Sequence, residues 1–245
     1  MQNSEKIEYS LGSLTFNGYA SYDNDWKEKR PAVLVAPTWM GLNRFAQAQA
    51  EALVELGYVG FAVDLFGMGK TASDQIEAKK LITPLIEDRR QIRDRMKAAF
   101  DRIRQHHLVD PHKIAAIGFC FGGSCVLEFA RGGYPLLGAV SFHAVFGNPY
   151  KLKMKPLPPA EQIKSSVLVL HGYKDPMAQE EDLLLFQREM SERGVDWQVI
   201  VYGEAMHAFT NPNANLPEIG LQYDEKTAKR AWLAMSLFLS EIFKT

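Results

Sequence analysis

A cysteine stands among glycines in the segment Gly118–Gly123, which reads GFCFGG. Apolar residues precede and follow the segment, as expected for a sharp strand-to-helix turn that presents a nucleophile. Such a turn needs glycine on both sides, because side chains at Gly118 and Gly122 would collide with neighbouring backbone. The N-terminus of the following helix favours negative charge, which for a cysteine increases the thiolate population. We therefore predict that Cys120 is a nucleophile; the alternative is an inert cysteine in a glycine-rich turn.

Two later residues could complete a catalytic triad with Cys120. Asp175 lies in HGYKDPM and His207 in YGEAMHAF, each just after an apolar run. Nucleophile, acid and base follow in this order in hydrolases with such a turn, and the carboxyl ends of parallel strands are where these sheets build their sites. We predict that His207 is the base and that Asp175 orients it. The alternatives are a structural Asp-Pro turn at Asp175 and a hydrogen-bonded loop histidine at His207.

Acyl transfer also requires two backbone N–H groups that bind the oxyanion of the tetrahedral intermediate. Phe121, the residue after the nucleophile, is expected to supply one of them. The loop after the apolar run Pro31–Pro37 is expected to supply the other, with Trp39 as the best donor. The candidates for the substrate pocket are Thr38, Met40, Phe119, His143, Phe209 and Asn211.

The elements that must position these residues alternate between strand and helix patterns. Compact apolar runs predict buried strands at Pro31–Pro37 and Tyr58–Leu65. Further strands are predicted at Lys113–Gly118, Leu136–His143, Ser166–Gly172 and Asp196–Gly203. Amphipathic or charged stretches predict helices at Phe45–Leu56, 74–106, Ser124–Arg131, 180–193 and 224–243. A strand pair is expected around Gly12, at 7–10 and 14–20. This alternation predicts a mostly parallel central sheet with helices on both faces, in one α/β domain over residues 1–245.

Other reactive or charged residues are assigned to structure. Cys125 is expected to be a small buried hydrophobe, and His106 is expected to be solvated. The charged stretch Asp88–Arg95 reads as a solvated helix face, the alternative being an arginine that reaches a substrate carboxylate. No two histidines have a zinc-binding spacing, so we predict no metal and no other cofactor.

The composition excludes several classes of protein. The chain has 245 residues, 47% hydrophobic and 23% charged, which is ordinary for a soluble globular protein. A net charge of −1 builds no positive field for nucleic acid or an anionic membrane. The two cysteines suggest no disulfide framework, the first ten residues lack the apolar core of a signal peptide, and no apolar run approaches the ~20 residues of a membrane-spanning helix. We expect a cytoplasmic protein with a small-molecule partner, and both monomer and homodimer stay open.

At these motifs the chain resembles the dienelactone hydrolase family, a cysteine-nucleophile branch of the α/β-hydrolase superfamily. The resemblance runs through VLVAPTWMGLN, GFCFGG, HGYKDPM and MHAFTNP. It implies the α/β-hydrolase fold, a triad of Cys120, Asp175 and His207, and oxyanion donors at Phe121 and Trp39. It also implies a carboxylic ester hydrolase that cleaves an ester, lactone or related acyl bond through an acyl-enzyme.

Two positions depart from the pattern of the chlorocatechol-pathway members. A glutamate that follows the first buried strand and helps control the cysteine is Thr38 here. An arginine that binds the substrate carboxylate shortly after the catalytic histidine is Asn211 here. The resemblance therefore transfers the fold and the triad, but not the dienelactone substrate. The alternative function is a ligand-binding or thiol-sensing protein that keeps the fold with little catalysis.

Overall fold

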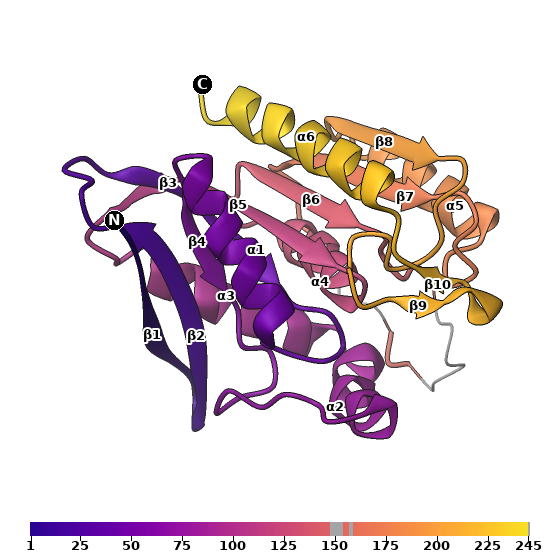
Figure 1. Ribbon diagram of the computed structural model, residues 1–245, viewed down its shortest axis with the longest axis horizontal. Helices are drawn as coiled ribbons and strands as arrows, with labels where there is room; N and C mark the ends of the chain where they lie inside the picture. The colour runs from indigo at the N-terminus through magenta and orange to yellow at the C-terminus, as the bar shows by residue number, and fades with distance from the viewer. Residues whose placement is uncertain (148–153, 157–158, 245) are drawn as a thin grey trace.

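The computed structural model describes residues 1–147, 154–156 and 159–244, and within these a central sheet is flanked by helices (Figure 1). The sheet has the order β1-β2-β4-β3-β5-β6-β7-β8. Its strands are β1 (Gln2–Leu11), β2 (Leu14–Asp23), β3 (Arg30–Ala36), β4 (Val59–Ala62), β5 (Val109–Phe119), β6 (Gly138–Phe142), β7 (Ser166–Gly172) and β8 (Trp197–Tyr202). Only the β1–β2 and β2–β4 pairs among them are antiparallel. The prediction of a mostly parallel sheet is thus confirmed.

Helices cover both faces of the sheet, as predicted (Figure 1). They are α1 (Arg44–Glu55), α2 (Gln75–Glu87), α3 (Arg90–Ile103), α4 (Phe121–Arg131), α5 (Glu180–Glu192) and α6 (Glu225–Ile242). Successive side chains of β3 point to opposite faces. Leu34 therefore packs in a cluster with α3 and α4, whereas Val33 and Val35 pack in a cluster with α1 and α6. Two apolar layers consequently hold the strands, and the ends of those strands carry the candidate residues.

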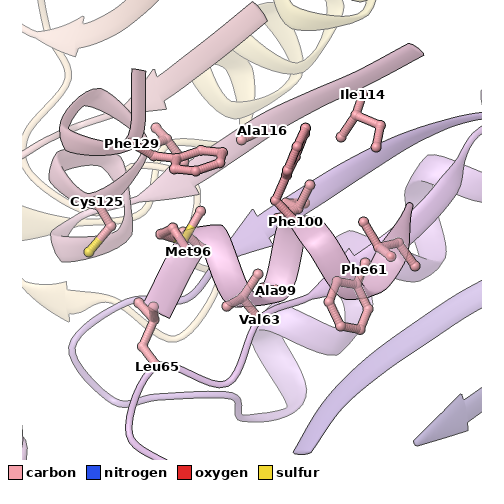
Figure 2. Packing of buried hydrophobic residues seen from close by; sticks show 14 of the residues in the cluster. Phe61, Val63, Leu65, Met96, Ala99, Phe100, Ile114, Ala116, Cys125 and Phe129 are labelled. Carbon is pink, nitrogen blue, oxygen red and sulfur yellow. The ribbon is translucent and has the colours of Figure 1, made fainter. Parts of the chain in front are cut away.

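The layer beneath α3 and α4 is shown in Figure 2, where Met96, Phe100 and Phe129 meet the sheet. Cys125 is fully buried in this cluster, and burial raises the pKa of its thiol well above the usual value. A thiol that stays protonated and inaccessible is unreactive. The prediction that Cys125 is a small buried hydrophobe is confirmed.

The predicted helix over 74–106 is two helices. Asp88, at the end of α2, leaves the helical region with φ −130° and ψ 89°, and α3 starts at Arg90. The predicted strand Tyr58–Leu65 is also shorter, because the buried Asp64 carboxylate accepts hydrogen bonds from the backbone N–H groups of Phe66 and Gly67 and bends the chain there. Both breaks depend on local backbone turns that the apolar and charged periodicities do not encode.

His106 is buried instead of solvated. Its Nε2 lies 3.1 Å from Glu5 Oε1, and its ring packs against that of Tyr22 at 5.2 Å. Burial lowers the pKa of this imidazole. The sequence prediction is wrong because Glu5 comes from the distant strand β1, whose pairing with β2 brings it beside the end of α3.

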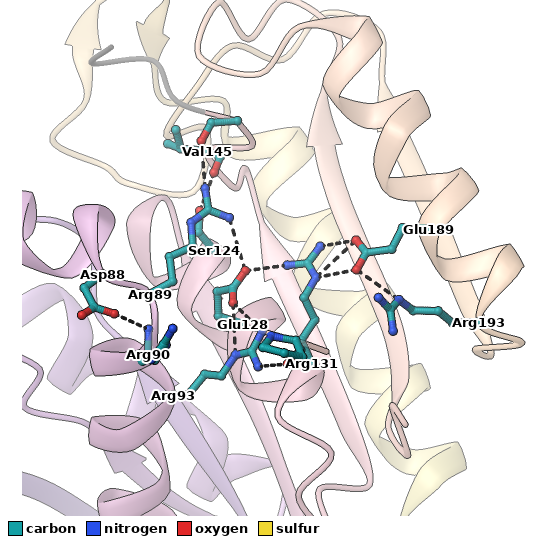
Figure 3. Close-up of polar contacts among 12 residues, drawn as sticks. Asp88, Arg89, Arg90, Arg93, Ser124, Glu128, Arg131, Val145, Glu189 and Arg193 are labelled. Atoms are coloured by element: carbon teal, nitrogen blue, oxygen red, sulfur yellow. Dashed lines mark hydrogen bonds and ion pairs between the residues drawn. The ribbon is translucent and has the colours of Figure 1, made fainter. Parts of the chain in front are cut away.

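The stretch Asp88–Arg95 is only partly a solvated helix face. Figure 3 shows Glu128 of α4 surrounded by three guanidinium groups. Glu128 oxygens lie 3.3 Å from Arg89 Nη1, 3.2 Å from Arg93 Nη2 and 3.0 Å from Arg131 Nη1. Glu128 and Arg93 are 2% and 7% exposed. A carboxylate this deeply buried needs such partners, since burying an unpaired charge costs several kcal/mol.

Replacing Glu128 by alanine is expected to lower the free energy of unfolding by about 3–5 kcal/mol, because it leaves buried guanidinium groups uncompensated. Urea unfolding measures the change. The matched control is Glu225→Ala in α6, which breaks an ion pair with the solvent-exposed Lys229 and should leave the free energy of unfolding nearly unchanged, because exposed ion pairs contribute little to stability. Equal stability of the two variants would show that the cluster does not support the fold.

Candidate active site

Cys120 occupies the turn between β5 and α4 and has φ 56° and ψ −119°, a backbone conformation that L residues rarely adopt. The flanking glycines are required, as the sequence suggested. A Cβ on Gly118 would lie 2.0 Å from the carbonyl oxygen of Gly122, and a Cβ on Gly122 would lie 2.2 Å from that of Ala36. The tight packing of α4 against the ends of β3 and β5 thus fixes where Cys120 stands.

His207 and Asp175 meet in the interior, although 31 residues separate them in the sequence. Nδ1 of His207 lies 2.7 Å from Oδ2 of Asp175, and the residues are 1% and 4% exposed. The other carboxylate oxygen of Asp175 accepts a hydrogen bond of 2.8 Å from the backbone N–H of Met177. Asp175 is therefore held in the turn after β7 and aimed at the imidazole.

A small hairpin that the sequence patterns did not reveal holds the His207 loop. It consists of β9 (Asn215–Leu216), the 3₁₀ turn η1 (Pro217–Ile219) and β10 (Leu221–Gln222). The His207 N–H donates to the carbonyl oxygen of Gly220 at 2.9 Å, and the N–H of Gln222 donates to that of His207 at 3.1 Å. The hairpin therefore fixes the backbone on which the imidazole is mounted.

The second ring nitrogen of His207, Nε2, is buried, and the residue lines the same cavity as Cys120. Burial opposes protonation of the ring, but the charge of Cys120 and the hydrogen bonds to Asp175 and Cys120 outweigh it and raise the pKa of His207 to about 10. The imidazole is thus oriented by Asp175, influenced by Cys120, and has a strong tendency to hold a proton.

His143 ties the cysteine turn to the His207 loop. Its Nδ1 accepts the backbone N–H of Cys120 at 3.1 Å, so Nε2 carries the proton and donates to Thr210 Oγ1 at 2.8 Å. The residue has φ 36°, and its ring stands edge-on to that of His207 with centroids 5.1 Å apart. Burial lowers the pKa of His143 well below 6.5. The neutral imidazole of His143 therefore holds the Cys120 turn and the His207 loop together.

The buried neutral state of His143 predicts acid sensitivity. The unfolded chain binds a proton at this residue more readily than the folded chain, so the free energy of unfolding is undiminished above the usual pKa of 6.5 and falls as pH drops below it. His143→Asn removes the titrating group and tolerates the positive φ. Urea unfolding at neutral pH and near pH 5 should show a smaller acid-induced loss in the variant. A loss identical to that of the unmodified chain would contradict this account; His106 and His171, whose pKa values are also lowered by burial, supply the remainder.

The two backbone N–H groups predicted to bind an oxyanion belong to Phe121, at the start of α4, and to Trp39, in the loop after β3. No acceptor receives the N–H of Phe121 or Trp39 among the residues that the structure describes. In the loop after β3, Thr38 accepts hydrogen bonds from Met40 and Gly41, through Oγ1 and its carbonyl oxygen. The turn that these bonds form leaves the intervening N–H of Trp39 available.

A cavity of about 330 Å³ opens beside Cys120 and His207. Four of the predicted pocket residues line it, namely Thr38, Met40, His143 and Asn211. Phe119 and Phe209 do not; they are 1% and 0% exposed and pack in the core behind the cavity wall. The Phe119 side chain packs in the cluster beneath α1 and α6, where its ring stacks on that of Phe142 with centroids 4.6 Å apart. Apolar residues beside a nucleophile in sequence thus need not lie beside it in space.

Several lining residues escaped the sequence analysis, and they come from four separate segments. They are Asn43 and Phe45 at the start of α1, Asp74 and Gln75 at the start of α2, and Met177, Ala208, Asn213, Ala214, Asn215, Leu216 and Leu221 near the hairpin. The Asn-rich run shortly after His207 was the sequence signal that could have revealed the last group.

Among the described residues no cluster of three or more His, Cys, Asp or Glu side chains is arranged to hold a metal ion. In the same part of the chain, no helix has the length and apolarity to cross a bilayer.

Comparisons with known proteins agree with this architecture. A dienelactone hydrolase-like promiscuous phosphotriesterase from metagenomic libraries is 36% identical, covers 99% of both chains and superposes with a TM-score of 0.89. A curated relative from Aquifex pyrophilus, "Protein usf", is 29% identical over 97% of this chain and 98% of its own. A "Probable 2-oxo-3-(5-oxofuran-2-ylidene)propanoate lactonase" from Bradyrhizobium sp is 27% identical over 73% of each chain. Residues 16–243 match the dienelactone hydrolase family. The chain therefore belongs to the dienelactone hydrolase family, and it is a carboxylic ester hydrolase of that type.

Proposed function

We propose that the chain hydrolyses esters or lactones by acyl transfer through Cys120, His207 and Asp175. The observation that supports this most strongly is the 2.7 Å contact between His207 and Asp175, which orients the ring, together with the charge of Cys120 and its hydrogen bond to the same ring. An oriented imidazole next to a sulfur in a strained turn is the arrangement that activates a nucleophile.

The proposed reaction has two half-steps. His207 takes the proton of Cys120, the thiolate attacks the carbonyl carbon, and the N–H groups of Phe121 and Trp39 bind the oxyanion. The intermediate collapses to a thioester on Cys120 as the leaving oxygen takes the proton from His207. His207 then removes a proton from water, the resulting hydroxide attacks the thioester, and the acid leaves while Cys120 regains its proton.

The cavity favours uncharged substrates. None of its lining residues is a lysine or an arginine, and Asp74 is the one carboxylate among them. A substrate carboxylate buried there would meet no compensating cation, which is costly in a partly desolvated site. We therefore propose neutral esters or lactones as substrates, in contrast to a lactone that carries a carboxylate. Both cysteines are free thiols, and a cytoplasmic location is part of the same proposal.

A panel of small aryl esters, lactones and thioesters tests the function, with one phosphotriester added because of the 36% identical structural neighbour. We expect a burst of product equal to the protein concentration, followed by slower turnover, and we expect a thiol alkylator to abolish both. Cys125→Ser serves as the control, and it should keep the burst because that thiol is buried. Tight binding of these compounds with no turnover would instead support the ligand-binding or thiol-sensing alternative.

A further inference from the structure

A second, smaller cavity meets the first at the nucleophile. It has a volume of about 30 Å³, against about 330 Å³ for the cavity beside His207. Among the lining residues that the structure describes, the two cavities have Trp39 and Cys120 in common. We call the smaller one the slot; its apolar wall is formed by Ile82, Ile86, Ile92, Trp39 and Phe121. We propose that the slot binds the acyl chain of the substrate and restricts it to a short, uncharged chain, an assignment that rests on the function proposed above.

The position of His207 decides which part of the substrate enters which cavity. His207 lines the large cavity but not the slot. The leaving oxygen must accept its proton from Nε2 of His207, so the alcohol part of the ester belongs in the large cavity. The acyl chain departs from the same carbonyl carbon in another direction. Cys120 lines the slot as well, together with Trp39 and Phe121, so the slot can receive that chain.

The size of the slot limits the length of the chain. About 10–15 Å³ of such space holds one water-sized group, so about 30 Å³ accommodates roughly two or three methylene-sized groups. Acyl groups of about two to four carbons therefore fit without rearrangement. A longer chain would have to displace the isoleucines of α2 and α3, and packed cores resist added methylenes.

The slot is also lined by polar residues, and these already have hydrogen-bond or ionic partners within the protein. Arg89 borders it and donates to Glu128 at 3.3 Å and to the carbonyl oxygen of Gly147 at 3.0 Å. Ser124 donates its hydroxyl to the carbonyl oxygen of Val145 at 2.6 Å. Glu128, which is 2% exposed, also lines the slot. A carboxylate at the end of the acyl chain would have to compete with Glu128 and the carbonyl oxygen of Gly147 for the Arg89 guanidinium, so the slot favours uncharged chains.

Ile86 offers a substitution that can be made in both directions. It lines the slot and is only half-buried, so both a smaller and a larger side chain should be tolerated. The experiment measures kcat/KM for p-nitrophenyl acetate, butyrate, hexanoate and octanoate, normalised to active sites counted by the product burst. The unmodified chain should prefer acetate or butyrate to octanoate by at least about tenfold. Ile86→Ala should raise the ratio of hexanoate to acetate by about tenfold, as expected for burying two more methylenes, and Ile86→Phe should lower the ratio of butyrate to acetate.

Leu216→Ala provides the matched comparison, because Leu216 lines only the large cavity. It should leave the chain-length ratios unchanged and alter the preference among leaving alcohols. Chain-length ratios that respond to Leu216→Ala but not to the Ile86 variants would reverse the assignment of the two cavities. A preference of the unmodified chain for octanoate would overturn the proposal outright. If the unmodified chain hydrolyses no ester at all, the proposed function itself fails, which is a different result from turnover without chain-length selection.

Discussion

His207→Ala is expected to lower kcat for ester hydrolysis by at least about 10²–10⁴-fold, the usual contribution of a general base. Without the imidazole, nothing accepts the Cys120 proton or returns it to the leaving oxygen. Steady-state turnover of an aryl ester measures the effect. A variant at an exposed histidine, His112→Ala, should keep the unmodified rate, since His112 lies away from the cavity lining.

The partition between kcat and KM makes this test specific. Because His207 acts on transferred protons, its loss should appear in kcat and leave KM for a neutral ester nearly unchanged. A decrease of less than tenfold in kcat, or a change confined to KM, would mean that His207 shapes the pocket without taking part in proton transfer.

Asp175→Asn is expected to lower kcat by about 10³–10⁴-fold, as removal of the orienting carboxylate does in comparable triads. It should also move the pH dependence. The hydrogen bond to Asp175 and the charge of Cys120 raise the pKa of His207 to about 10 against the effect of burial. Activity that needs the protonated ring therefore declines only as pH rises through about 10, and loss of the Asp175 charge should shift this decline to lower pH.

The pH profile of kcat/KM between about pH 6 and pH 11 records both effects. Glu204→Gln is the control, because Glu204 is an exposed carboxylate paired with Lys174, three residues before His207 in the sequence. In that variant the decline of kcat/KM at alkaline pH should occur at the same pH as in the unmodified chain. If Asp175→Asn loses rate but its alkaline limb stays near pH 10, the carboxylate does not set the protonation of His207.

Cys120, Asp175 and His207 could be placed at one end of the sheet because each follows a strand that the sequence pattern predicts. The sharp turn at Cys120 could also be predicted from its flanking glycines, because the constraint is local: a Cβ at Gly118 or Gly122 has no room. A mostly parallel sheet with helices on both faces follows from the alternation of strand and helix with right-handed crossovers, whereas the order of the strands does not. Physical constraints that act within about ten residues were thus visible in the sequence.

What escaped prediction depends on contacts between distant segments. The hairpin of β9 and β10 has two residues per strand, too few for any periodicity, yet it holds the His207 backbone. Arg93 reads as one more charge on a helix, and only the docking of α3 on α4 places it against the buried Glu128. Phe119 adjoins the nucleophile in sequence but points into the core, because strand residues alternate between faces. Residues of α2, α3, α4 and the loop after β3 line the slot together, so the sequence of any one of these segments does not predict it.

The central claim is that the sulfur of Cys120 becomes acylated during turnover. Intact-protein mass spectrometry of the chain, quenched in acid during the burst with a slowly deacylating aryl ester, tests this directly, with peptide mapping to locate the added mass. We expect one acyl group per chain, located on Cys120 and absent from Cys120→Ala. Undiminished hydrolysis by Cys120→Ala, or an acyl group found on Ser124 or another residue instead, would contradict the account.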